Sequence, residues 1–299
     1  DIYAGGGGRL HYGYGAGAYG YGAHGGRGWN AFNDSDYIAL DAHVLSTPTV
    51  ADINNDGHVE IVLAVSYFFD RNTYADTEAG EAADKEGLDL TKYVGGGIVC
   101  YDLELQDWVW SVHLDLTTDD QRWRAYIYGA PTIADLDGDG VMEVIVGTSL
   151  GLLYVLDAQT GFTRRGFPAQ FGPIESQVAV ADVTGDGSLE MIFMDMQGNL
   201  LVVDDDANVV WDRRLSGSSS GTPSIGDIDG DGTLDIAVLT TTEGGAAHLW
   251  AVRGDTGKDL PAFPIMLLET GQGPLAPPVL LVDLHDATAA DPDPIATAA

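Results

Sequence analysis

The stretch that decides the fold covers residues 128–147 and reads YGAPTIADLDGDGVMEVIVG. Its centre is a nine-residue acidic loop that begins at Asp135, with a second Asp at position 5, Gly at position 6 and a carboxylate at position 9. An apolar, β-branched run follows directly, which is typical of a strand. An EF-hand loop would join two helices and place a bidentate Glu at position 12, but position 12 here is Val146. The stretch therefore predicts an acidic loop that leads into a β-strand.

The same loop occurs four times, and we number the copies first to fourth in chain order. Position 3 always carries an oxygen donor, and Gly at position 6 permits a sharp backbone reversal that a Cβ resists. Calcium prefers six to eight oxygen ligands, which alternating residues of a tight loop can direct at one point. Asp-Gly pairs are also ordinary turn formers. Four copies with an acid at position 9 nevertheless favour calcium, so we predict about four bound Ca²⁺ ions.

The predicted ligands lie at positions 1, 3, 5, 7 and 9 of each loop, with the backbone carbonyl binding at position 7. The third loop is predicted to bind most weakly, because Thr184 replaces a charged ligand there. No catalytic or organic-cofactor residue is predicted. The full ligand set is Asp52, Asn54, Asp56, His58 and Glu60; Asp135, Asp137, Asp139, Val141 and Glu143; Asp182, Thr184, Asp186, Ser188 and Glu190; and Asp227, Asp229, Asp231, Thr233 and Asp235.

Loop spacing predicts the architecture. Asp135 and Asp182 are 47 residues apart and Asp182 and Asp227 are 45 apart, which matches the roughly 40–50-residue period of propeller blades. Asp52 and Asp135 are 83 residues apart, and we assign the excess to an acidic surface insertion at about residues 68–94 with some helix. The predicted fold class is all-β: a β-propeller of four-stranded blades with calcium loops, incomplete or truncated.

Composition divides the chain into three regions. Residues 1–34 are Gly- and Tyr-rich and are expected to be flexible, residues 35–285 hold the repeats, and residues 286–299 form a low-complexity Ala/Asp/Pro tail. A fifth unit starts near Asp283, but its acidic loop lacks the Gly and the strand that should follow. Repeats need neighbours to bury their faces, so whether the ring closes within this chain stays open.

Charge limits the partners. The net charge is −33, from 46 acidic and 13 basic residues, so phosphate backbones and anionic membrane surfaces are repelled. We predict no nucleic-acid partner, and membrane attachment only through segments absent from this sequence. The single cysteine, Cys100, lies in an apolar run and is expected to be buried. Weakly binding extracellular calcium modules require millimolar calcium, so we expect a secretory, cell-surface or extracellular location, where Asn33 begins a glycosylation sequon.

Several stretches resemble known families. The segment YGAP at 128–131, before an acidic loop, resembles the FG-GAP repeats of integrin α-chain propellers. A closer resemblance is to the plant and algal defective-in-exine-formation family. It extends from about Ser35 to Leu284 and is carried by SDYIALDAHVLSTPTVADINNDG, AVSYFFD, RAYIYGAPTIADLDGDG, VGTSLGLLYVLD, PSIGDIDGDG and PVLLVDL. The resemblance implies a calcium-binding cell-surface propeller that patterns cell wall or extracellular matrix, with further repeats and a C-terminal membrane anchor.

Three functions are compatible with these features. The leading hypothesis is a non-enzymatic binding or scaffold module whose partners are extracellular glycans or proteins. A rival is calcium-dependent, lyase-like cleavage of polysaccharide, in which Arg122 and Arg124 would contact an acidic sugar. A solvent-exposed pair at a strand edge is the simpler interpretation of these arginines. The third function is a structural tile within a larger extracellular assembly.

Overall fold

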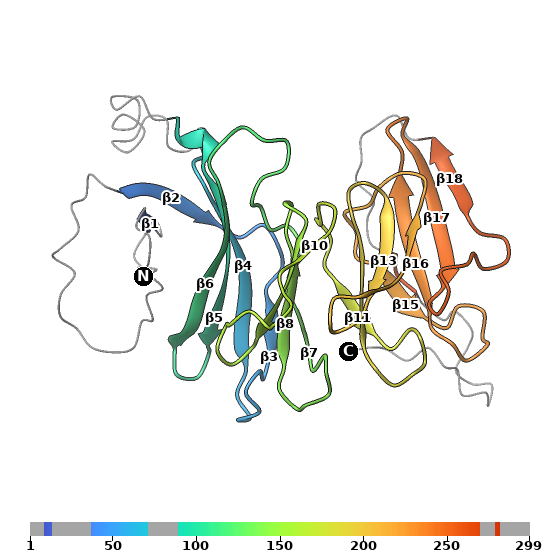
Figure 1. Cartoon of the computed structure of the whole chain (residues 1–299), viewed down its shortest axis with the longest axis horizontal. Helices are drawn as coiled ribbons and strands as arrows, with labels where there is room; N and C mark the ends of the chain where they lie inside the picture. Colours follow the sequence, from blue (N-terminus) through green and yellow to red (C-terminus); the bar gives the residue numbers. More distant parts are fainter. Residues whose placement is uncertain (1–8, 14–36, 71–88, 270–278, 282–299) are drawn as a thin grey trace.

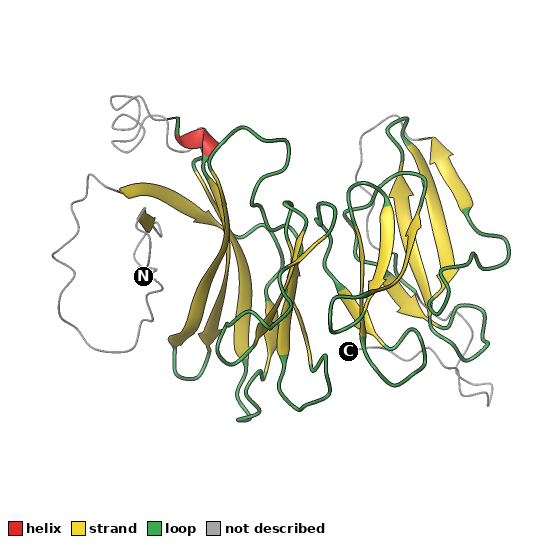
Figure 2. Cartoon of the chain, in the orientation of Figure 1, coloured by secondary structure: helices red, strands yellow, loops and turns green. Residues whose placement is uncertain are grey.

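The computed structural model describes residues 9–13, 37–70, 89–269 and 279–281. Strands dominate this part of the chain (Figure 2), and η2 (Leu90–Lys92) is a single turn of 3₁₀-helix. None of the described helical residues forms a segment long and apolar enough to span a bilayer. The predicted all-β class is confirmed.

Four antiparallel sheets follow one another along the chain (Figure 1). In the second to fourth sheets, four consecutive strands pair in chain order, so each sheet corresponds to one repeat of the sequence. The second sheet contains β7 (Thr132–Ala134), β8 (Glu143–Gly147), β9 (Leu152–Asp157) and β10 (Ala169–Gln170); the third contains β11 (Ala179–Ala181), β12 (Glu190–Met194), β13 (Asn199–Val203) and β14 (Val209–Arg214); the fourth contains β15 (Ser224–Gly226), β16 (Asp235–Thr241), β17 (Ala246–Arg253) and β18 (Ile265–Glu269).

The first sheet is larger than the others. Its inner edge has two parts, because β3 pairs with the first residues of β4 and β2 pairs with the last ones. An additional strand, β1, pairs with β2. The strands are β1 (Arg9–Gly13), β2 (Tyr37–His43), β3 (Thr49–Ala51), β4 (Glu60–Phe68), β5 (Val94–Asp102) and β6 (Asp107–Thr117).

The predictions for the N-terminal segment, the acidic insertion and the C-terminal tail concern residues that are described only in part. Five residues of the N-terminal segment expected to be flexible form β1, because ladder hydrogen bonds to β2 supply an order that composition does not show. The rest of residues 1–34, including the Asn33 sequon, lies outside the described residues. So do residues 71–88 of the acidic insertion and the tail from residue 282 onwards.

The middle strands are buried because consecutive sheets stack face to face. Neither β8 nor β12 has an exposed residue. Val144 packs with the first sheet while its neighbour Ile145 packs with the third. In the same way Phe193 packs with the second sheet and Ile192 with the fourth. Stacking on both faces therefore explains the continuous apolar runs after each acidic loop, and each fully buried large side chain contributes roughly 1.5–3 kcal/mol.

The short inner strands β3, β7, β11 and β15 contact one another in order. Thr132 Oγ1 of β7 donates to the carbonyl of Val178, 2.5 Å away, just before β11. Ser224 Oγ of β15 donates in the same manner to the carbonyl of Val279. Val279 thus takes the place beside β15 that the next inner strand would occupy. The architecture is an incomplete β-propeller, and the sheets do not close into a ring within the described ranges.

Two tryptophans fasten neighbouring blades at equivalent positions. Trp110 of β6 donates its Nε1–H to the carbonyl of Ala158, and Trp211 of β14 donates to that of Gly254, both at 2.7 Å. The Trp211 indole also packs on Gly257, which has φ of 64°. A Cβ at Gly257 would lie 2.8 Å from a ring carbon, so this contact requires glycine. The outer strand of one blade is therefore pinned to a turn of the next.

Candidate metal centre

Each acidic loop connects the inner strand of a blade to the second strand. The first loop lies between β3 and β4 and the second between β7 and β8, at the lower edge of the view in Figure 1. Asn55 of the first loop places its Nδ2 3.4 Å from the carbonyl of Gly140 in the second. Sites far apart in the sequence are thus gathered along one edge of the propeller.

All four loops share one hydrogen-bonded skeleton. The position-1 carboxylate accepts from the position-6 N–H, the position-5 carboxylate from the position-7 N–H, and the position-9 carboxylate from the position-2 N–H. The position-6 glycines have φ between 88° and 93°, as their predicted turn requires. In the fourth loop the three distances are 2.8 Å for Gly232 N to Asp227 Oδ2, 2.9 Å for Thr233 N to Asp231 Oδ1 and 2.9 Å for Ile228 N to Asp235 Oδ2.

The position-9 carboxyls are buried at the base of each loop. Their exposed fractions are 0% for Glu60, 4% for Glu143, 2% for Glu190 and 0% for Asp235. Burial is the largest effect on all four groups and raises the pKa of each above its ordinary value, because a charged carboxylate loses its water there. The backbone hydrogen bond from position 2 opposes this shift without cancelling it.

Three carboxylate oxygens of the loops are buried and have no hydrogen-bond partner among the described residues. They are Oε1 of Glu60 in the first loop, Oδ1 of Asp135 in the second and Oδ1 of Asp235 in the fourth. A buried anionic oxygen without a partner is costly. A divalent cation would neutralise and coordinate it. The residues present therefore fit a hard cation such as calcium.

Three loops bring three carboxylates together. In each set the ligand atoms lie within 4.8 Å of one another. Asp139 and Asp231, at position 5 of the second and fourth loops, are outside these sets although both were predicted ligands. The sets are Asp135, Asp137 and Glu143; Asp182, Asp186 and Glu190; and Asp227, Asp229 and Asp235.

The first loop is arranged differently. It is not among the converging carboxylate sets found in the described residues. The amide Nδ2 of Asn54 donates to Asp56 Oδ2 at 2.9 Å, so these two predicted ligands contact each other. The His58 ring contacts the carboxylate of Glu104, which follows β5. At position 7 of all four loops the backbone N–H is hydrogen-bonded, and the ligand role of the carbonyl there stays a prediction.

Two arginines from outside the loops reach the carboxylates, and sequence reasoning missed both. Arg164, after β9, places Nη2 2.9 Å from Asp137 Oδ2 in the second loop. Arg253, at the end of β17, pairs with Asp231 and lies 3.9 Å from Asp229 Oδ2 in the fourth. Hydrogen bonds from Thr233 lower the pKa of Asp231 to about 2, and the hydrogen bond and charge of Arg253 make smaller contributions in the same direction. The two arginines follow their loops at different distances in the sequence, so no fixed spacing identifies them.

The arginines considered for an acidic sugar have local partners. Arg124 Nη1 donates to the carbonyl of Thr91 at 2.6 Å, and its Nη2 lies 2.6 Å from Asp120 Oδ1. The guanidinium of Arg122 lies 5.2 Å from the ring centre of Trp123. Neither arginine belongs to a strand. The expected pair at a strand edge is therefore wrong in its placement, and Arg124 is held by contacts within the fold.

No protein-family model and no curated protein matches this chain. Similar solved structures include the rhamnogalacturonan lyase PL11 of Bacillus licheniformis, with 16% identity over 76% of this chain and 43% of that one and a TM-score of 0.46. Quinohemoprotein alcohol dehydrogenase from Comamonas testosteroni is 14% identical over 78% of this chain and 46% of that one, with a TM-score of 0.44. The PilY1 C-terminal domain of Pseudomonas aeruginosa is 18% identical over 72% of this chain and 50% of that one, with a TM-score of 0.42. This chain thus spans half or less of their length. Likeness at this level carries no argument about activity.

Proposed function

We propose that this chain is a calcium-binding propeller segment that acts as a non-enzymatic binding or scaffold module for extracellular glycans or proteins, in cell-wall or extracellular-matrix organisation. One observation carries the calcium part of the proposal. Loops with the same hydrogen-bonded skeleton bury one carboxylate oxygen each of Glu60 and Asp235 where no donor from the described residues reaches it. A turn-forming role alone does not explain these oxygens, because the turn bonds use the other oxygen of the same carboxylates.

The fourth loop illustrates how the carboxylates would hold an ion. In the fourth loop Asp227, Asp229 and Asp235 would hold the ion, because their oxygens already converge. A bound cation supplies positive charge that offsets the repulsion among these carboxylates. Asp235 also begins β16, so a cation held there links the loop to the buried second strand. This coupling supports a role in stiffening the edge of the propeller.

The non-enzymatic part of the proposal rests on how the patterned acids are used. General acid–base chemistry needs carboxyls that face a substrate. Here the position-5 and position-9 carboxylates accept hydrogen bonds from the backbone of their own loops. They are thus engaged in holding the turns. A stiff propeller edge whose carboxylates hold their own turns is suited to binding partners.

Calcium stoichiometry tests the metal proposal. Titration of CaCl₂ into chelator-stripped protein, followed by calorimetry, should give about four sites with affinities in the range of extracellular modules, about 10⁻⁴–10⁻³ M. Asp227→Asn should remove one site. Asp206→Asn is the matched control, since Asp206 is an exposed acid in the turn after β13. Absence of binding at millimolar calcium, or equal loss in both variants, would contradict the proposal.

A separate assay tests the absence of catalysis. Calcium-loaded protein is incubated with neutral and acidic polysaccharides, and both reducing ends and unsaturated products are measured over time. We expect no release above the rate in heat-inactivated protein. Sustained turnover that Asp227→Asn abolishes would replace the scaffold proposal with a calcium-dependent enzyme.

A further inference from the structure

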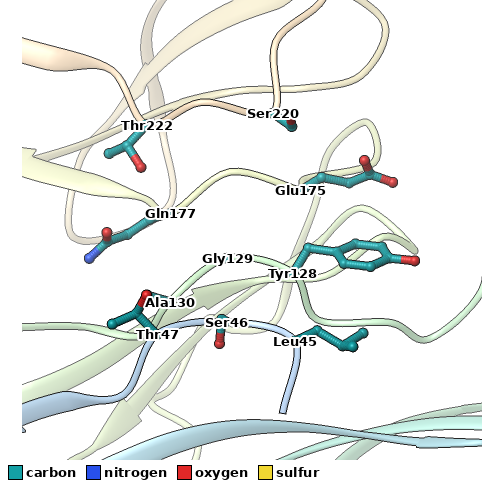
Figure 3. Close-up of a pocket in the computed structure, with 10 residues that line it drawn as sticks. All are labelled: Leu45, Ser46, Thr47, Tyr128, Gly129, Ala130, Glu175, Gln177, Ser220 and Thr222. Atoms are coloured by element: carbon teal, nitrogen blue, oxygen red, sulfur yellow. The ribbon is translucent and has the colours of Figure 1, made fainter. Parts of the chain in front are cut away.

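A pocket lies at the end of the inner strands opposite to the acidic loops. Its cavity volume is about 300 Å³. The segments that lead into all four inner strands line it: Ser46 comes from the first blade, Tyr128 from the second, Glu175 and Gln177 from the third and Thr222 from the fourth. Figure 3 shows Tyr128 and Glu175 extending to the same side of this pocket. No single repeat contains the site, since it exists only where the blades meet.

The wall between the second and third blades depends on a glycine. At Gly129 a Cβ would lie 2.4 Å from the carbonyl oxygen of Ser176. Only a residue without a side chain lets these two lead-in segments approach so closely. On the same wall, Gln177 Nε2 donates to Thr132 Oγ1 at 3.2 Å, which fixes the amide across the two blades. The pocket is therefore held in shape by packing and hydrogen bonds within the protein.

The described residues that line the pocket are polar for the most part, and none of them is cationic. Hydroxyls of Ser46, Tyr128 and Thr222, the Gln177 amide and the Glu175 carboxyl provide hydrogen-bonding groups, and no Lys or Arg is among the lining residues. The Ser46 hydroxyl oxygen is buried and has no hydrogen-bond partner. Burial raises the pKa of Tyr128 to about 12, and the charges of Tyr126 and Glu175 make smaller contributions in the same direction. The Tyr128 hydroxyl therefore remains protonated, and can donate a hydrogen bond, throughout the physiological pH range.

A ladder of four rings runs from the pocket to the first blade. Tyr128 stacks on Tyr126 with ring centres 5.5 Å apart and an interplanar angle of 27°. Tyr126 meets Phe68 edge-on at 5.5 Å, and Phe68 stacks on His43 at 3.9 Å. Tyr128, at the pocket end, is 40% exposed. The ladder fixes the orientation of the Tyr128 ring and leaves part of its surface available for a ligand.

We propose that this pocket and the Tyr128 end of the ladder bind a neutral oligosaccharide. A sugar ring presents C–H groups on its faces, which pack on an aromatic ring, and hydroxyls on its rim, which pair with hydroxyl, amide and carboxyl groups. The net charge of −33 and the absence of a cation in the lining disfavour acidic sugars. This inference rests on the proposed function, because it takes glycans as the partner class.

The pocket size favours a sugar over a folded protein. Ligand pockets typically measure about 300–1,000 Å³, and this cavity lies at the lower end of that range. A stable protein interface buries about 800 Å² on each partner and has an apolar core, which this small polar cavity does not provide. A cationic peptide is the main competitor, because Glu175 contributes a carboxylate to the described lining.

The test uses calcium-loaded full chain and calorimetric titration with defined probes. The neutral probes are cellohexaose, xylohexaose, mannohexaose and maltohexaose, and the competitors are hexagalacturonate and hexalysine. We expect at least one neutral hexasaccharide to bind and Tyr128→Ala to weaken that binding about tenfold. Phe162→Ala is the matched control, because Phe162 is an exposed ring outside the pocket, and it should leave the affinity unchanged.

Three outcomes would overturn the inference. They are failure of all four neutral probes to bind, tighter binding of hexagalacturonate or hexalysine than of any neutral probe, and unchanged affinity in Tyr128→Ala. If Tyr128→Ala does not fold, Tyr128→Phe keeps the ring and removes the hydroxyl. We then expect binding weakened about two- to fivefold, and unchanged affinity counts against the inference. Calcium stoichiometry is measured on the same samples, so loss of sugar binding with intact calcium binding refutes this inference alone.

Discussion

The second and fourth acidic loops differ from the first and third by one acid and one arginine. In the second, position 3 is Asp137 and Arg164 pairs with it at 2.9 Å. In the fourth, position 3 is Asp229 and Arg253 lies 3.9 Å away while pairing with Asp231. In the other two loops position 3 is a neutral amide or hydroxyl. No arginine forms an ion pair with these two loops in the described part of the chain.

The formal charge of the four loops is the same when these arginines are included. Four acids and one arginine leave −3, and three acids without an arginine also leave −3. The sequence ranks the third loop weakest because only acids inside the loop are counted. The charge balance predicts instead that the second and third loops bind calcium alike. The affinity of a loop is thus set partly by residues that the repeat pattern does not contain.

The largest expected effect comes from removing calcium. At about 1 mM calcium and affinities of about 10⁻⁴–10⁻³ M, four sites together contribute about 2–6 kcal/mol. We expect a chelator to lower the melting temperature by roughly 10 °C. Hydrogen exchange should then increase more in the first and third loops, because no arginine remains there to offset the carboxylates. An unchanged melting temperature in scanning calorimetry would argue that the loops are ordinary turns.

Substitution of a buried position-9 carboxyl should have opposite effects with and without calcium. Glu60→Gln changes a loop without an arginine partner, and Asp235→Asn changes a loop with one. Each variant should lose one ion, and with calcium its melting temperature should fall by roughly 2–5 °C. In chelator each variant should melt above the parent, because a buried charge with an unpartnered oxygen is removed. Thermal melts of both variants against Asp206→Asn check this. Destabilisation in both conditions would mean that these carboxyls act only as turn anchors.

Acidification from pH 7 toward the ordinary carboxyl pKa of about 4 should stabilise the calcium-free protein. The pKa values of Glu60, Glu143, Glu190 and Asp235 are raised in the folded state. Their burial cost is therefore present above the folded pKa and is relieved as pH falls through it. Asp231, with a lowered pKa of about 2, loses its stabilising contribution only at lower pH.

With calcium the pH effect should reverse, since protonation competes with ion binding. Thermal melts across this pH range, with chelator and with calcium, measure both slopes. In chelator, Glu60→Gln and Asp235→Asn should flatten the slope, which separates these groups from the general relief of a net charge of −33. Equal slopes with and without calcium would count against metal binding at these carboxyls.

The smallest expected effect is the most specific to the comparison. Arg164→Ala and Arg253→Ala remove a competing positive charge, and partly exposed ion pairs are worth about 0–1 kcal/mol. We expect calcium to bind about two- to fivefold more tightly at the second and fourth loops. Arg213→Ala is the matched control, because Arg213 pairs with Asp259 outside the loops. Calorimetric titration that shows unchanged or weaker binding in both loop variants would refute the charge balance.

Local patterns in the sequence predicted much of the fold. The apolar runs after each loop became strands buried on both faces, and the position-6 glycines adopt the positive φ that their turn requires. Cys100 is buried, as its apolar surroundings indicated. These features depend on neighbours close in the chain. The Trp211 contact to Gly254 was missed, because it joins residues 43 positions apart in different blades.

The sequence by itself determined the acidic loops, their order and the strands beside them, because side-chain chemistry and turn geometry act over a few residues. Only the tertiary structure decided which outside groups meet those loops. Arg164 reaches Asp137 across 27 positions, and the pocket around Tyr128 gathers segments of four blades. Such juxtapositions follow from the stacking of sheets, which buries apolar faces wherever neighbours fit. That stacking sets long-range partners that no local spacing encodes.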